Sequence, residues 1–209
     1  MKIIIIGSAN PTIFGLIADI NQNSGNTYSV LGVLDNDYAN LPKLVFGYPV
    51  LGPFQKILDY KRNEIVLINC IAGSMSVRQA TTTYFLEMGY VFTTLVHPTV
   101  NLRETLVGTG TIIYQNAMIH PYVTIGEHCV VSSLSGIAHE SIIEDFSFIG
   151  PSSYICGKVL VMRGAYLGVG CRILPRLTIG KNATVGACSM VNKNVPNDCR
   201  VQGTPAKVI

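Results

Sequence analysis

The segment from Leu95 to Pro196 repeats every six residues. Reading it in steps of six from Leu95 gives 17 hexads without an insertion, and 16 of the 17 leading residues are aliphatic. The fifth position is mostly small, as at Thr111, Ser141 and Ala183. A helix repeats close to 3.6 residues and a single strand at about 2, so a period of six fits neither. A long array of short repeats predicts a solenoid of stacked coils.

Each hexad can supply one short strand and one corner. The leading aliphatic residue and the small residue four places later then point inward, while Gly, Asn or Asp suits the corner, where positive φ costs little. Three hexads close one triangular coil, and stacked coils lie about 4.8 Å apart, the usual spacing between strands. An ordinary β-sandwich of alternating strands is the alternative, but it does not keep an unbroken period of six. The pattern resembles the left-handed β-helix of the hexapeptide acyltransferases.

The segment before the hexads alternates strands with helices. We expect strands at 2–6, 28–34, 64–69 and 90–95, a short extended piece at 47–51, and helices at 12–23, 53–62 and 74–88, the last with Ser74 as its N-cap and Gly89 at its end. This order predicts a small parallel sheet with right-handed crossovers, similar to a Rossmann fold. The predicted domains are therefore an α/β domain at 1–94 and a β-helix with a C-terminal tail at 95–209.

Polar residues follow the predicted strands of the α/β domain. Because ligands of parallel sheets bind beyond the carboxyl ends of the strands, we expect a binding rim at Gly7, Ser8, Asp35, Asn36 and residues 69–73. The first turn lacks the G-x-G-x-x-G dinucleotide fingerprint. It fits either a simple strand-to-helix turn or a pocket for a sugar or sugar nucleotide.

Composition excludes several classes of protein. The net charge is +3, with 13% charged residues and no basic stripe, so nucleic acid is not an expected partner. The apolar runs are too short to span a bilayer, and Met1 leads almost directly into a strand, which argues against a signal peptide. The six cysteines show no C-x-x-C spacing, so we interpret them as reduced packing residues of a cytoplasmic protein. A hydrophobic content of 48% suggests buried subunit faces in an oligomer.

The four histidines do not form one cluster. Counting hexads by threes places His97 on one face of the β-helix, His128 on a second, and His120 with His139 on the third. Carbonic anhydrases of this fold bind zinc through three histidines, two of them in a His-x4-His pair, which is missing here. We therefore expect no metal site.

The whole chain is similar to the sialic acid O-acetyltransferase (NeuD) family. That family joins a small nucleotide-binding-like α/β domain to a left-handed β-helix, and its superfamily often ends in a Gly-x-Pro-Ala-Lys turn like the one at 203–207. Members include N-acetyltransferases of UDP-4-amino sugars and of GDP-perosamine. The resemblance implies a homotrimeric, acetyl-CoA-dependent sugar O- or N-acetyltransferase of surface glycan synthesis, for example of lipopolysaccharide or capsule.

His139 and Glu140 are the predicted catalytic residues. His139 occupies the third hexad position, at a corner where its side chain can project outward. The resemblance makes His139 the general base and Glu140 its orienting partner. Two alternatives are an exposed pair without a role and a cysteine nucleophile, although the register turns Cys129, the one cysteine beside a histidine, inward.

The resemblance also implies a coenzyme site along the coils. The family places the N–H donor to the oxyanion at the glycine matching Gly157, and the pantetheine arm near the positions of Val169 and Ala187. Basic residues that could bind the coenzyme phosphates, chosen by position alone, are Arg172, Lys193 and Lys207.

The acceptor residues depart from the family pattern. Nucleotide-sugar members carry Gly-His in the first turn, where this chain has Asn10-Pro11-Thr12. Ser132 aligns with an asparagine of some members, and Phe148 stands where close relatives have a second histidine. The expected acceptor contacts are Gly7, Ser8, Asp35, Asn36 and Ser132. Other hypotheses are a different acyl donor, a serine-type small acceptor, and a non-catalytic β-helix scaffold.

Overall fold

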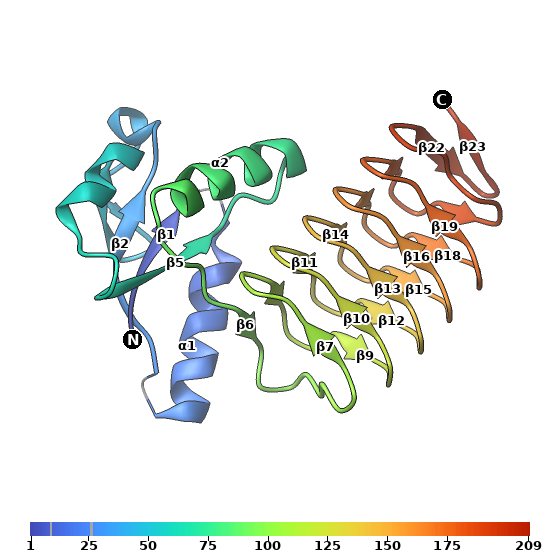
Figure 1. Ribbon diagram of the computed structural model, residues 1–209, viewed down its shortest axis with the longest axis horizontal. Coiled ribbons are helices and arrows are strands. Elements are labelled where there is room, and N and C mark those ends of the chain that lie inside the picture. The colour runs from blue at the N-terminus through green and yellow to red at the C-terminus, as the bar shows by residue number, and fades with distance from the viewer. Residues whose placement is uncertain (9, 26) are drawn as a thin grey trace. The chain divides into compact units, whose positions relative to one another are not determined.

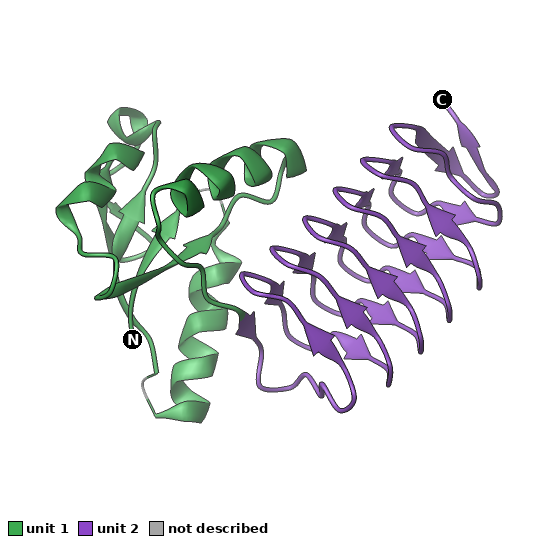
Figure 2. Ribbon diagram, viewed as in Figure 1, with its two compact units in different colours: residues 1–94 green, residues 95–209 purple. Residues whose placement is uncertain are grey.

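The computed structural model describes residues 1–8, 10–25 and 27–209. The chain divides into two compact units, Met1–Thr94 and Leu95–Ile209 (Figure 2). No helix among the described residues is both long enough and apolar enough to cross a membrane.

The first unit is built on a five-stranded sheet with the strand order β3-β4-β2-β1-β5 (Figure 1). Its elements in chain order are β1 (Lys2–Ile6), α1 (Thr12–Ser24), β2 (Ser29–Leu34), the 3-10 helix η1 (Tyr38–Asn40), β3 (Leu44–Val45), β4 (Tyr48–Gly52), the 3-10 helix η2 (Phe54–Asp59), β5 (Ile65–Asn69) and α2 (Met75–Glu87). Strands β5, β1, β2 and β4 run parallel, whereas β3 is antiparallel to β4. Strand β1, which lies between β2 and β5, is buried from Ile3 to Ile6, as a strand covered on both faces must be.

Two elements of this unit differ from the prediction. The helix predicted at 53–62 is the shorter 3-10 helix η2, because the Tyr90 hydroxyl bonds the carbonyl oxygens of Ile57 (2.8 Å) and Tyr60 (2.9 Å) at its end. The strand predicted at 90–95 is reduced to one bridge between Phe92 and Leu67. Leu95 already belongs to the second unit.

The second unit is the left-handed parallel β-helix that the hexads predict (Figure 1). One sheet holds β7 (Leu106–Val107), β10 (Thr124–Ile125), β13 (Ile142–Ile143), β16 (Leu160–Val161) and β19 (Thr178–Ile179). A second holds β6 (Leu95–Val96), β8 (Ile112–Ile113), β11 (Val130–Val131), β14 (Phe148–Ile149), β17 (Tyr166–Leu167), β20 (Thr184–Val185), β22 (Arg200–Gly203) and β23 (Ala206–Val208). The third holds β9 (Met118–Ile119), β12 (Gly136–Ile137), β15 (Tyr154–Ile155), β18 (Arg172–Ile173) and β21 (Met190–Val191).

The register of the β-helix follows the hexads. Ile125 pairs with Ile143, and Ile143 with Val161, so each coil takes 18 residues. The leading side chains fill the interior, where Ile143 and Val161 are fully buried. Inward-pointing serines at the fifth position are satisfied by backbone; Ser141 Oγ, for example, donates to the carbonyl oxygen of Cys156 at 3.0 Å. The core is therefore apolar in its leading positions and hydrogen-bonded in its small ones.

The fourth hexad position forms each corner. Its residues adopt left-handed backbone angles, including Glu140 (φ 60°), Lys158 (φ 62°) and Arg176 (φ 61°). The polar side chains of Glu140, Lys158 and Arg176 therefore lie at a corner, outside the packed core.

Candidate active site

His139 and Glu140 lie together at one corner of the β-helix, the corner that follows the sheet of β9, β12, β15, β18 and β21. Nδ1 of His139 is 2.9 Å from Glu140 Oε2. Because a carboxylate accepts hydrogen bonds, Nδ1 carries the proton and Nε2 keeps its lone pair. The hydrogen bond from His139, and then the neighbouring Lys158 ammonium, lower the pKa of the Glu140 carboxyl. The pair thus exposes the basic Nε2 of His139 to solvent, while Nδ1 of the same ring is hydrogen-bonded to the ionised Glu140 carboxylate.

Gly157 lies one coil further along and directly under the imidazole. A Cβ atom added to Gly157 would lie 2.7 Å from His139 Nε2 and 2.8 Å from Cε1, closer than real Cβ contacts. Only glycine therefore lets the ring rest against this backbone.

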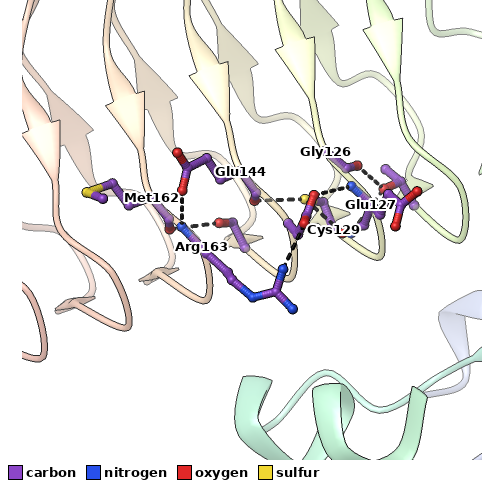
Figure 3. Close-up of polar contacts among 9 residues, drawn as sticks. Gly126, Glu127, Cys129, Glu144, Met162 and Arg163 are labelled. Carbon is purple, nitrogen blue, oxygen red and sulfur yellow. Dashed lines mark hydrogen bonds and ion pairs between the residues drawn. The ribbon is translucent and has the colours of Figure 1, made fainter. Parts of the chain in front are cut away.

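The Gly157 N–H differs from equivalent amides on another corner. At that corner the third-position N–H groups are capped by side chains: Glu127 N–H donates to Asp145 Oδ1 at 2.9 Å, and Arg163 N–H to Glu144 Oε2 at 2.8 Å (Figure 3). The Gly157 N–H has no hydrogen-bond acceptor within residues 1–8, 10–25 and 27–209. A donor without an acceptor beside a basic nitrogen is the arrangement that an oxyanion site needs.

The sequence did not single out Lys158. Its Nζ lies 3.4 Å from Glu140 Oε1, the oxygen that His139 does not use. The signal was available, since Lys158 follows Glu140 by 18 residues, one coil of the β-helix. The same spacing joins Asp145 and Arg163 at 2.8 Å on another corner.

The predicted coenzyme residues fall into two groups. Lys193 lies at the third position of the same corner as His139, and with Lys207 it lines a cavity of about 390 Å³ at the end of the β-helix. Val169 and Ala187 are exposed on a different corner, the one after the sheet of β17 and β20. Arg172 directs Nη1 at the carbonyl oxygens of Ser152 (2.7 Å) and Gly170 (2.9 Å), so it braces the backbone.

A second cavity, of about 530 Å³, lies in the α/β unit at the carboxyl ends of β1, β2 and β5. Its lining residues are Gly7, Asp35, Asn36, Phe54, Cys70, Ile71, Ala72, Gly73, Ser74, Val77 and Thr81. This set includes three of the predicted acceptor contacts. Of the other two, Ser8 lies beside the cavity as a partner of Asp35, and Ser132 is buried in the β-helix.

Asp35 is engaged by its own loop. Its Oδ2 accepts from Ser8 N–H (2.9 Å) and Oγ (2.6 Å), and its Oδ1 accepts from Asp37 N–H (2.9 Å). Asn36 uses Oδ1 to accept from Phe54 N–H at 2.9 Å, and its amide nitrogen has no partner among the described residues. Asn36 can therefore donate to a ligand, while Asp35 shapes the turn.

Of the other histidines, His97 and His128 contact neighbouring side chains, and the cysteines Cys70, Cys129 and Cys171 are buried. His97 Nδ1 bonds Thr99 Oγ1 at 2.9 Å, and His128 stacks on Phe146 at 5.1 Å between ring centroids. Phe148 stacks on Tyr166 at 4.6 Å. The described residues contain no group of three or more His, Cys, Asp or Glu side chains that could hold a metal ion.

No protein-family model matches the chain. The chain is 35% identical over 107 residues to the UDP-3-O-acylglucosamine N-acyltransferase of Methylobacterium sp. (strain 4-46), which is 51% of this chain and 25% of that protein. It is 32% identical over 119 residues to the putative acetyltransferase YvoF of Bacillus subtilis (strain 168), which is 56% of this chain and 55% of YvoF. The chain thus spans about a quarter to about half of the length of these curated relatives.

Several solved structures match the entire chain. Among them is a variant of perosamine N-acetyltransferase from Caulobacter crescentus in complex with CoA and GDP-perosamine, with 24% identity, a TM-score of 0.89, and coverage of 100% of this chain and 97% of that one. Over about half of its length the chain is therefore similar in sequence to an acyltransferase and to a putative acetyltransferase. Its α/β unit followed by a left-handed β-helix is the fold of the perosamine N-acetyltransferase.

Proposed function

We propose that the chain is an acetyl-CoA-dependent sugar acetyltransferase of surface glycan synthesis, with His139 as its general base. The observation that carries the proposal is the corner geometry: His139 Nδ1 is held by Glu140 at 2.9 Å, and the ring rests on Gly157. The relatives named above are acyl- and acetyltransferases, which supports this chemistry for the same β-helix.

The reaction proceeds in one direct transfer. Nε2 of His139 removes a proton from the acceptor amine or hydroxyl as that atom attacks the thioester carbonyl of acetyl-CoA. The Gly157 N–H stabilises the negative charge on the carbonyl oxygen. When the C–S bond breaks, the proton on Nε2 passes to the departing CoA thiolate, which restores the neutral imidazole. Glu140 stabilises the imidazolium between these steps.

Coenzyme and acceptor would occupy different parts of the molecule. We assign the coenzyme phosphates to Lys193 and Lys207, since both residues line one cavity. We assign the acceptor's remote portion to the cavity at Gly7 and Asn36, where apolar walls suit a planar ring and the Asn36 amide can donate a hydrogen bond. The unit Met1–Thr94 is accordingly the acceptor-binding domain of the proposal.

Two acceptor classes fit, and each has its own support. The likeness to an enzyme crystallised with GDP-perosamine favours the amine of a nucleotide-linked amino sugar. The Asn10-Pro11-Thr12 stretch lacks the first-turn histidine of nucleotide-sugar enzymes, which favours a sialic-acid-like hydroxyl, as in the sialic acid O-acetyltransferase (NeuD) family.

The test is acetyl-CoA turnover, measured as free thiol, against a panel of nucleotide-linked amino sugars, free amino sugars, sialic-acid-like sugars and L-serine. His139→Ala should abolish turnover, whereas the control His120→Ala, on the same face of the β-helix, should retain it. Turnover that survives His139→Ala refutes the general base. Absence of both coenzyme binding and turnover leaves the scaffold hypothesis.

A further inference from the structure

Glu140 is bound through both of its carboxylate oxygens. Oε2 faces His139 Nδ1 at 2.9 Å, and Oε1 faces the Lys158 ammonium at 3.4 Å. The Glu140 and Lys158 side chains are each 47% exposed, so solvent competes for both charges. A free glutamate at such a site would exchange among several rotamers, most of which would not face the imidazole.

The β-helix itself brings Lys158 to this place. Lys158 and Glu140 are both fourth-position residues of the same corner, with φ angles of 62° and 60°. Lys158 N–H also donates to the His139 carbonyl oxygen at 3.0 Å, which fixes the two coils in register. The side chains therefore leave adjacent coils in the same direction, about one strand spacing apart.

We propose that Lys158 is a positioning residue for the His139–Glu140 pair. By holding Oε1, its ammonium keeps Glu140 in the rotamer whose other oxygen accepts from His139 Nδ1, and this hydrogen bond keeps the lone pair on Nε2. The inference rests on the proposed function for its kinetic consequence, but the hydrogen-bond geometry on which it depends is independent of any substrate.

The kinetic test compares Lys158→Met and Lys158→Arg with the matched control Arg176→Met. Arg176 occupies the next coil of the same corner with the same left-handed φ of 61° and the same charge. We expect Lys158→Met to lower kcat about fivefold, the size of effect that a half-exposed ion pair can exert, with KM for acetyl-CoA unchanged. Lys158→Arg should recover most of the loss, and Arg176→Met should leave kcat unchanged. A raised KM for acetyl-CoA at unchanged kcat would instead make Lys158 a phosphate ligand and overturn the proposal.

A second measurement does not depend on turnover. In ¹⁵N NMR spectra of the intact protein, the His139 signals are identified by their loss in His139→Ala. Lys158→Met should reduce the fraction of the Nδ1–H tautomer, and Arg176→Met should not. If the tautomer ratio is the same in all three proteins, Lys158 does not position the pair. If it changes in Lys158→Met while no acceptor is acetylated, the inference holds and the proposed function is what fails.

Discussion

At the scale of single residues, Gly157 has no room for a side chain beside the His139 ring. Gly157→Ala places a methyl group 2.7 Å from His139 Nε2, so the ring must move off the backbone. We expect kcat to fall about a hundredfold, because a displacement of about 1 Å at a reacting group can cost that much. The thermal midpoint should change little, since the ring lies at the surface. Wild-type turnover in this variant would show that His139 need not rest on Gly157.

Cysteine reactivity offers a second residue-scale prediction. Burial raises the pKa of the Cys70 thiol to about 11, whereas Cys188 is exposed. Since the thiolate is the reactive form, Cys70 should resist iodoacetamide at pH 8 in the folded protein while Cys188 reacts. The folded state favours neutral Cys70, so its contribution to stability is present at neutral pH and is lost as the pH rises toward 11. Peptide mass spectrometry of the labelled protein measures the extent of alkylation at Cys70 and at Cys188. Rapid labelling of Cys70 would contradict its burial.

Residue roles could be predicted from the sequence where the hexad spacing sets them. The corner position of His139 and the inward positions of Cys129 and Cys171 follow from counting. The role of Asp35 could not be predicted this way, because its carboxylate is used by Ser8 and Asp37 in a turn whose shape depends on the folded loop. The contact of Lys158 with Glu140 can be predicted only by comparing residues 18 positions apart, one full coil, rather than six.

At the scale of elements, the repeat and the strand-helix alternation predicted nearly every strand and both long helices. The failures have a tertiary cause. The segment after Pro53 has a helical pattern, but the Tyr90 hydroxyl takes the carbonyl oxygens of Ile57 and Tyr60, so the turn stays short. The hydrophobic periodicity of a segment cannot reveal a hydrogen bond from a side chain thirty residues away in the sequence.

Helix α1 provides a paired test of glycine. Gly15 is the fourth residue of the helix and is exposed, with nothing within 4 Å of an added Cβ, whereas Gly25 ends the helix at φ 73°. Gly15→Ala should raise the free energy of unfolding by about 0.5–1 kcal/mol, because alanine is the better helix former. Gly25→Ala should lower it by about 1 kcal/mol, because alanine resists the left-handed region. Urea denaturation measures the free energy of unfolding of both variants. If both substitutions raise it, or both lower it, by the same amount, Gly25 does not end the helix.

At the scale of the whole molecule, the residues assigned to catalysis and to the coenzyme do not share one corner. His139, Gly157 and Lys193 follow one sheet, whereas Val169 and Ala187 follow another. A single β-helix cannot place both sets around one acetyl group, since its packed core separates the corners. The two sets can meet if a corner of one copy faces a different corner of the next, as in a closed ring of copies. We therefore propose a homotrimer, and light scattering should give three times the 22.6 kDa chain mass.

Mixing two inactive proteins tests this arrangement directly. His139→Ala removes the base from one corner, and Val169→Glu puts a carboxylate into the coenzyme path at another. Each trimer alone should be inactive. Suppose that every site is formed by one corner from each of two neighbouring copies. In trimers assembled from an equal mixture, about one site in four then combines an intact His139 corner with an intact Val169 corner. These trimers should therefore regain about a quarter of the wild-type activity. The readout is acetyl-CoA turnover after joint refolding, with separately refolded proteins mixed afterwards as the control. No recovery from the joint sample, with trimers present by light scattering, would place the whole site within one copy.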